Sequence, residues 1–118
     1  MSISRETLQR YLDVHNAAID AGDFAALVQL FAPDGELHFV GIDFGPFAGR
    51  DAIAAAFRER PPINKLALTS VTADGNKATA VYATAENPGE RAGTLVLTTE
   101  GELIRRLTIS VIKRPTDG

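Results

Sequence analysis

The apolar residues of this chain change their spacing at about residue 65, and this change limits the possible fold more than any other feature. Before it, except in a short alternating stretch at 36–40, apolar side chains recur every three or four residues, as on one face of an α-helix. After it, they alternate with polar residues, as in strands with one buried face. Helices followed by a run of strands indicate an α+β fold, with helices packed on one face of a curved, mostly antiparallel sheet.

Three helices are expected in the first part of the chain. The first has Ser4 as its N-cap and ends at Gly22. Its apolar face is formed by Leu8, Tyr11, Leu12, His15, Ala18 and Ile19. Asp23 is expected to cap a short second helix, whose apolar face would be formed by Phe24, Leu27, Val28, Leu30 and Phe31.

The third helix is expected from Ala52 to about Arg58, with Ile53, Ala56 and Phe57 facing inward. Pro61-Pro62 would stop it, because proline cannot continue a helical hydrogen-bond ladder. Strands are expected at 36–40, 65–72, 77–85, 91–99 and 103–113. Pro33-Asp34-Gly35 reads as a turn, residues 41–49 as a loop or bent hairpin, and 114–118 as a frayed tail. The length of 118 residues fits a single domain, 1–118.

Charge and composition exclude several classes of function. The formal net charge is −3, which argues against binding to nucleic acid or to an anionic membrane surface. The chain has no cysteine, so disulfides and thiolate chemistry are excluded. No signal peptide and no apolar run of about 20 residues is readable. We therefore expect a cytoplasmic protein without a nucleic-acid or membrane partner.

Several short motifs carry a family resemblance that covers nearly the whole chain. They are QRY at 9–11, AGDF at 21–24, LFAPDG at 30–35, FAGRDAI at 47–53 and GELIRRL at 101–107. With these motifs the chain resembles the nuclear transport factor 2-like (NTF2-like) superfamily, which includes the SnoaL and ketosteroid-isomerase-like domains. The resemblance implies a cone-shaped, cystatin-like roll, with the sheet wrapped around the first helix and a pocket at its open end.

Ketosteroid isomerase, a member of this superfamily, uses an Asp base with a Tyr and a protonated Asp as oxyanion donors. Aligned on Ala21-Gly22-Asp23, the Tyr position falls on His15, the base on Phe39 and the second Asp near Gly93. The resemblance therefore implies that steroid isomerisation by this trio is doubtful. Members similar to limonene-epoxide hydrolase use an Asp-Arg-Asp arrangement, but no matching Asp follows on the late strands here.

His15 and Tyr11 are the candidate catalytic residues, because they share the helix face that this fold turns toward its pocket. Histidine titrates near neutral pH and can act as a general base or acid. A phenol can donate to a developing oxyanion. The alternative is that both residues simply pack in the core.

Tyr82 and Thr84 are candidate ligand contacts, since strand parity and the family alignment turn them inward. The same alignment turns Ile104, Arg106, Thr108, Ser110 and Ile112 inward. A buried Arg106 would need Glu86, Asp43 or a ligand anion as its partner, or else the assigned face is wrong. Glu86 could equally be an exposed residue at a strand end.

Phe39, Phe44 and Phe47 are expected to contact an apolar ligand, the last two from a loop that roofs the pocket. A metal site built from His15 and His38 is not expected, because the two residues show no recognised ligand spacing. No cofactor motif is present, since the glycines at 41, 45 and 49 precede no phosphate-binding Lys-Ser/Thr.

The sequence thus favours a cofactor-independent acid–base enzyme, such as an isomerase, cyclase or hydrolase, acting on an apolar ring-containing ligand. The alternative is a non-catalytic module that binds a small ligand or another protein. A homodimer is also expected, because apolar residues such as Leu103, Leu107, Ile109 and Val111 would leave a patch for a second copy to cover.

Overall fold

The computed structural model describes residues 3–61, 65–87 and 89–111 of the chain. Its helices are α1 (Ile3–Ala21), α2 (Ala25–Gln29) and α3 (Arg50–Glu59). Its strands are β1 (Phe31–Val40), β2 (Phe47–Ala48), β3 (Leu66–Asp74), β4 (Lys77–Thr84), β5 (Arg91–Glu100) and β6 (Leu103–Val111). Pro62 of the predicted helix stop, the predicted strand end at 112–113 and the predicted frayed tail at 114–118 lie outside the described residues.

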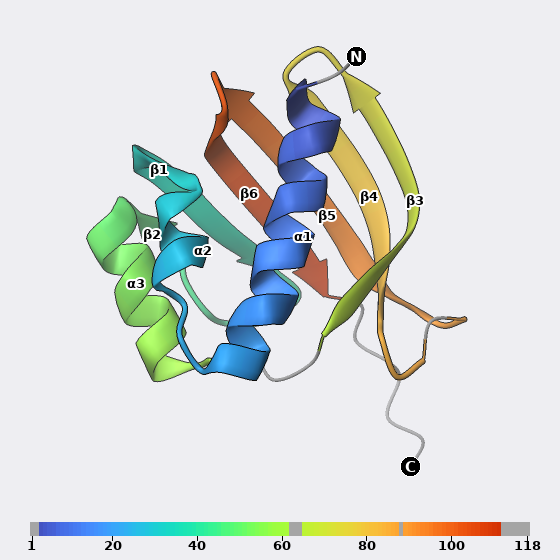
Figure 1. Ribbon diagram of the computed structural model, residues 1–118, viewed down its shortest axis with the longest axis horizontal. Helices are drawn as coiled ribbons and strands as arrows, with labels where there is room; N and C mark the ends of the chain where they lie inside the picture. Colours follow the sequence, from blue (N-terminus) through green and yellow to red (C-terminus); the bar gives the residue numbers. More distant parts are fainter. Residues whose placement is uncertain (1–2, 62–64, 88, 112–118) are drawn as a thin grey trace.

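The strands form one six-stranded sheet in the order β2-β1-β6-β5-β4-β3. All neighbours are antiparallel except β1 and β6, which run parallel. The sheet curves around α1, which crosses its concave face, while α2 and α3 lie beside α1 over β1 and β2 (Figure 1). The predicted α+β class and curved, mostly antiparallel sheet are confirmed.

The apolar stripe predicted for α1 faces the sheet. Leu8, Tyr11, Leu12, His15 and Ala18 are all buried, as their helical spacing requires. Ser4 lies within the first helical turn and not at a cap; its Oγ donates to the carbonyl of Gly75 at 3.1 Å. This contact fixes the start of α1 to the turn between β3 and β4.

The predicted second helix is shorter than expected, because Leu30 is its C-cap and Phe31 already belongs to β1. Phe31 is fully buried at the start of that strand and not on a helix face. Pro33-Asp34-Gly35 is likewise no turn but an irregularity inside β1, where the pairing with β6 jumps from Phe31↔Ile104 to Glu36↔Arg106. Residues 41–49 form the bent hairpin, with Phe47 paired to Leu37.

A bulge in β6 overturns the face predicted for its second half. Thr99 pairs with Ile104 and Thr98 with Arg106, so Arg105 is an extra residue in the ladder. Such a bulge reverses the alternation of side chains beyond it. Ile104 is buried as predicted, but after the bulge the inward side chains are Leu107, Ile109 and Val111, not Arg106, Thr108 and Ser110.

The outer face of the sheet is consequently more polar than predicted. At the outward-facing positions of β6, where apolar residues were expected, the structure has Thr108 and Ser110. The neighbouring outward-facing residues of β5 are Thr94, Val96 and Thr98. The apolar patch that suggested a homodimer is therefore mostly turned inward, and the homodimer stays a prediction without that argument. No helix among the described residues is both long and apolar enough to cross a membrane.

Candidate functional site

A hollow of about 350 Å³ lies between α1, the concave face of the sheet and the end of α3. Its lining comes from α1, α3, four strands of the sheet and the loop after β1. The lining residues are Tyr11, His15, Leu37, Phe39, Ile42, Phe44, Ala56, Phe57, Arg60, Leu66, Tyr82, Ile109 and Val111. Most of its wall is apolar, with a few polar side chains among it. That composition is typical of a small-molecule site.

His15 reaches this cavity from α1 and is held by its neighbour Asn16. The Nδ1 atom of His15 lies 3.0 Å from Asn16 Oδ1. Asn16 itself clamps the start of β3: its Oδ1 accepts from the Leu66 N–H and its Nδ2 donates to the Leu66 carbonyl, both at 2.9 Å. These two bonds fix the orientation of the amide, so the atom facing His15 is an acceptor.

The proton of the His15 ring therefore sits on Nδ1, and a neutral ring keeps an unprotonated Nε2. Nε2 forms no hydrogen bond within the described part of the chain. Every fully buried side-chain nitrogen or oxygen there has a partner, so Nε2 cannot be fully buried. Because His15 lines the cavity, we infer that Nε2 is accessible from it. Burial lowers the pKa of His15 below its usual 6.5, outweighing the hydrogen bond to Asn16, so the ring is neutral at pH 7.

Tyr11 and Tyr82 bring two hydroxyl groups to the same cavity. Tyr11 lies one helical turn before His15, with the two ring centroids 5.8 Å apart. Burial raises the pKa of Tyr11, with a smaller contribution from Tyr82, and burial also raises the pKa of Tyr82. Both phenols therefore stay protonated, and the one proton of Tyr82 is directed at the Ser110 carbonyl, 3.5 Å away.

Gly93 makes the position of Tyr82 possible. The two residues pair across β4 and β5. A Cβ on Gly93 would lie 2.7 Å from the Tyr82 hydroxyl and 1.9 Å from the Ser110 carbonyl oxygen. Without it, Tyr82 crosses β5 and its hydroxyl reaches within 3.5 Å of the Ser110 carbonyl on β6. Gly93 thus leaves open the space that this hydroxyl enters.

Three phenylalanines and one arginine close the cavity at the end of α3. The Phe44 ring lies 5.4 Å from Phe39 and 4.8 Å from Phe47, measured between centroids. The guanidinium carbon of Arg60 sits 4.6 Å from the centre of the Phe44 ring. Phe39 and Phe44 line the cavity, whereas Phe47 lies behind Phe44 and supports it.

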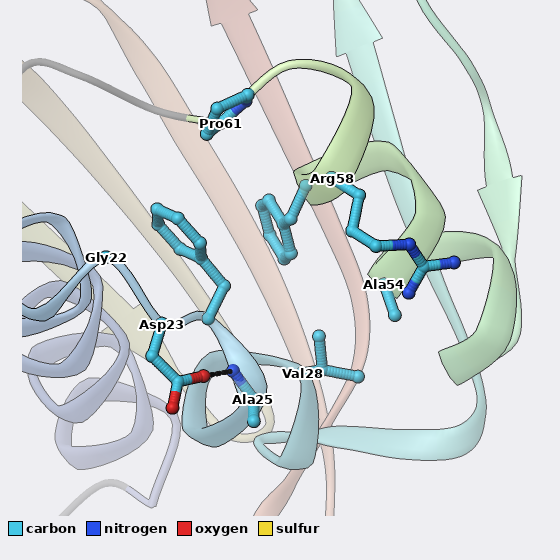
Figure 2. A pocket seen from close by; sticks show the side chains of 9 residues that line it. Gly22, Asp23, Ala25, Val28, Ala54, Arg58 and Pro61 are labelled. Carbon is cyan, nitrogen blue, oxygen red and sulfur yellow. Dashed lines mark hydrogen bonds between the residues drawn. The ribbon is translucent and has the colours of Figure 1, made fainter.

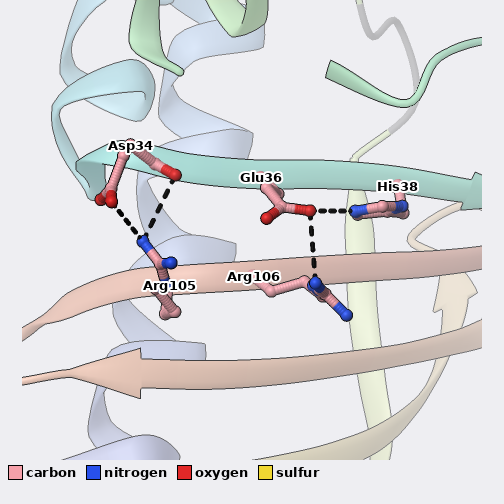
Figure 3. A network of polar contacts seen from close by, with 5 residues as sticks. All are labelled: Asp34, Glu36, His38, Arg105 and Arg106. Carbon is pink, nitrogen blue, oxygen red and sulfur yellow. Dashed lines mark hydrogen bonds and ion pairs between the residues drawn. The ribbon is translucent and has the colours of Figure 1, made fainter. Parts of the chain in front are cut away.

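Arg106 is not at the cavity, contrary to the sequence-based interpretation. Beyond the bulge it points to the outer face, where its Nη2 lies 3.3 Å from Glu36 Oε1. Glu36 also meets His38 Nε2 at 2.7 Å, and Arg105 pairs with Asp34 at 2.7 Å, all on the β1–β6 surface (Figure 3). Thr84 is absent from the cavity lining, and Glu86 is exposed.

A second hollow, of about 450 Å³, lies between α2 and α3 (Figure 2). Its lining includes the stacked pair Phe24 and Phe57, with ring centroids 5.7 Å apart. Asp23 and Arg58 stand at its rim, but Asp23 already accepts from the Ala25 N–H at 3.0 Å. No other titratable side chain lines this hollow, so we place the candidate chemistry in the smaller cavity beside His15.

Two polar residues that contribute to the site were not singled out from the sequence. Asn16 sits inside a helix, where asparagine is unfavourable, next to a residue of the buried face. That mismatch could have pointed to a structural hydrogen bond. Arg60 follows the last residue of α3 and gives no comparable sign. Among the described residues, no group of three or more His, Cys, Asp or Glu side chains could hold a metal ion.

Known structures with a similar fold include three bacterial proteins. A candidate ketosteroid isomerase from Kribbella flavida has a TM-score of 0.67 at 21% identity, covering 98% of this chain and 84% of that one. A nuclear transport factor 2-like protein of unknown function from Burkholderia xenovorans has a TM-score of 0.65 at 19% identity, covering 98% and 92%. A candidate polyketide cyclase from Sinorhizobium meliloti has a TM-score of 0.59 at 24% identity, covering 85% and 93%.

At these identities the likeness shows the fold and not the activity. No curated protein sequence matches the chain. The family comparison is more direct, because residues 8–107 match the SnoaL-like domain. That match spans α2, α3 and α1 from Leu8 onward, and it includes every cavity residue except Ile109 and Val111. It also contains the segments 21–24, 30–35 and 47–53 that carry the motifs. The chain therefore belongs to the SnoaL-like domain family of the nuclear transport factor 2-like superfamily.

Proposed function

We propose that this protein is a cofactor-independent acid–base enzyme, of the isomerase, cyclase or hydrolase type, acting on a largely apolar ring-containing ligand. One observation carries the proposal: Asn16 fixes the His15 proton on Nδ1, which leaves Nε2 unprotonated and facing an apolar cavity. A general base needs this combination of a free lone pair, a fixed orientation and access to the ligand.

In the proposed step, His15 Nε2 takes a proton from a ligand carbon beside a carbonyl, or from an attacking water. The imidazolium that forms then returns the proton to another atom of the ligand. Negative charge develops on the ligand oxygen as the proton leaves. The Tyr11 hydroxyl can donate to that oxygen, and the Tyr82 hydroxyl can do so once it leaves the Ser110 carbonyl, which accepts its proton at 3.5 Å in the free protein. The raised pKa values of both phenols keep them protonated.

This chemistry differs from the Tyr/Asp/Asp mechanism of ketosteroid isomerase. The positions aligned with that trio hold His15, Phe39 and Gly93, which supply no carboxylate. Phe39 contributes only apolar surface, while the space beside Gly93 is taken by the Tyr82 hydroxyl. A base on α1 with two phenolic donors would replace the carboxylates. The candidate isomerase and cyclase among the similar structures support a ring-containing ligand.

A non-catalytic binding module is the alternative function, and the apolar wall of the cavity favours it. Leu37, Phe39 and Ile109 give a ligand apolar contact without chemistry. The two functions differ in what His15 does, since a binder needs its shape and an enzyme needs its lone pair. Replacing His15 by Gln keeps a polar side chain of similar size and removes the base.

The test uses 2-tetralone, an apolar fused-ring ketone with acidic hydrogens next to its carbonyl. Deuterium uptake at these positions is followed by NMR in D₂O, with the parent protein and with His15→Gln. We expect the parent to accelerate the exchange and His15→Gln to lose about 10²–10⁴-fold of that acceleration. His38→Gln is the matched control, because the second histidine lies on the outer face of the sheet.

Binding of the ketone is measured in parallel by titration. Unchanged binding with lost exchange in His15→Gln supports the enzyme. If the parent binds 2-tetralone but leaves its exchange rate at that of buffer, the binding module is the better description. Equal loss of exchange in the two histidine variants would show that His15 is not the base.

A further inference from the structure

Arg60 is a cation at the cavity that the proposed acid–base step does not use. It follows α3, its side chain lines the cavity, and its guanidinium lies over the Phe44 ring at 4.6 Å. Phe44 is in turn held between Phe39 and Phe47. The position of the guanidinium is therefore set by a row of packed aromatic rings.

The charge of Arg60 is not neutralised within the described part of the chain. Lys65, Arg105 and Arg106 each meet a carboxylate within 4.0 Å, but Arg60 meets none there. Stacking on Phe44 occupies one face of the guanidinium. Its five N–H donors lie in the plane of the group and stay available, in a fork that fits a carboxylate.

We propose that Arg60 binds an anionic group of the ligand, so the ligand class is an apolar ring system carrying a carboxylate at one end. This inference rests on the proposed function, because it describes the ligand of the same cavity. The ring enters among Leu37, Phe39 and Ile109, and the carboxylate stays near the exposed Arg60, where little of its hydration is lost. The chain has a net charge of −3, so an anionic ligand needs a local cation at this point.

The test uses a matched pair of probes, 1-naphthaleneacetate and 1-naphthaleneacetamide. They share one ring system and differ in carrying a carboxylate or a neutral amide. Binding of each is measured by calorimetry to the parent protein, Arg60→Gln, Arg60→Lys and Arg58→Gln. Arg58 is the matched control: it lies in the last turn of α3, two residues before Arg60, and carries the same charge, but it lines the hollow between α2 and α3 (Figure 2).

We expect Arg60→Gln to weaken the binding of naphthaleneacetate about 10-fold, as loss of one charge-assisted contact predicts. The affinity for naphthaleneacetamide should change less than about 2-fold. Arg60→Lys should restore part of the loss, because it keeps the charge without the planar fork. Arg58→Gln should change the affinity for either probe by no more than about 2-fold. A further variant, Ile109→Trp, fills the cavity and should weaken both probes.

Three results would overturn the inference while leaving the proposed function intact. Arg58→Gln could match Arg60→Gln, which would show an effect of net charge alone. Arg60→Gln could weaken both probes equally, which would assign Arg60 only to the packing of Phe44. Arg60→Gln could also leave the binding of both probes unchanged, which would show that Arg60 does not contact the ligand. If instead neither probe binds the parent, or Ile109→Trp leaves both unchanged, the cavity takes no apolar ring ligand, and the proposed function fails together with this inference.

Discussion

The two histidines of the chain lie on opposite sides of the sheet, His15 on α1 against the concave face and His38 on the outer face of β1, and their side chains are in opposite situations. His38, on the outer face, meets the carboxylate of Glu36, which also meets Arg106 (Figure 3). His15, on α1 at the concave face, is 5% exposed, is bonded to a neutral amide and forms no ion pair with a carboxylate in the described part of the chain. One histidine is paired within the fold, and the other keeps a ring nitrogen available.

The comparison teaches that the surroundings, not the residue type, decide which ionisable group can act on a ligand. The outer face carries most of the charge of β1 and β6, yet its arginines and carboxylates neutralise one another. The concave face carries few polar atoms, but Nε2 of His15 has no hydrogen-bond partner among the described residues. The less polar face is therefore the better candidate for chemistry.

Adjacent residues of β6 test the assignment of the two faces with the largest expected effect. Leu107 is fully buried on the concave face, and Thr108 lies on the outer face. We expect Leu107→Ala to lower the free energy of unfolding by about 2–5 kcal/mol, because it leaves a cavity in the core. Thr108→Ala should change it by no more than about 0.5 kcal/mol. Urea denaturation of the two variants measures both values.

A reversed order of these two losses would contradict the bulge at Arg105, because the faces would then follow simple alternation from Ile104. The bulge is also the clearest case in which the sequence misled. Strand parity predicts the inward residues of an unbroken strand, and nothing in Leu103–Val111 marks Arg105 as an extra residue. Because of this error, Arg106 was wrongly predicted to line the ligand site, and the apolar residues of β6 beyond the bulge were wrongly predicted to face away from the cavity.

The rest of the fold could be predicted because it depends on local periodicity. The spacing of Leu8, Tyr11 and His15 placed them on one buried face of α1, and the pattern of turns separated the four late strands. Two of the candidate site residues on α1 and one on β4 line the cavity for that reason. The contacts of Asn16 with Leu66 and of Arg60 with Phe44 join segments distant in the chain, and no periodicity reports them.

Gly93 tests how the concave face accommodates Tyr82. A methyl group at this position would meet the Ser110 carbonyl oxygen and the Tyr82 hydroxyl. We expect Gly93→Ala to lower the free energy of unfolding by about 1–3 kcal/mol, since β5 and β6 must separate or Tyr82 must turn away. Thermal unfolding gives the loss, and the 2-tetralone exchange rate should fall with it if Tyr82 donates to the ligand.

Gly89→Ala is the control for this variant, because nothing lies within 4 Å of a Cβ built there. Its effect should be within about 0.5 kcal/mol and can be slightly stabilising, as alanine restricts the unfolded chain. If the two glycine variants behaved alike, the close approach of Tyr82 to β5 would not be a feature of the folded protein in solution.

The smallest effect expected is the pH dependence that separates the two faces. Burial lowers the pKa of His15 in the folded protein below 6.5, the value expected in the unfolded chain. Between these two pKa values the unfolded state binds more protons, so the contribution of His15 to stability is full above pH 6.5 and falls as the pH drops toward the folded pKa.

On the outer face, the hydrogen bond from His38 lowers the pKa of Glu36 below 4.5, with Arg106 adding to the effect. The stability from Glu36 is lost only at pH values below 4.5, so on acidification its loss begins later than the loss from His15, which begins at pH 6.5. Urea denaturation between pH 3 and pH 8 should therefore show the upper slope flattened in His15→Gln and the lower slope flattened in Glu36→Gln. His38→Gln controls for the second histidine: if it, rather than His15→Gln, removed the slope just below pH 6.5, the neutral ring assigned to His15 would be wrong.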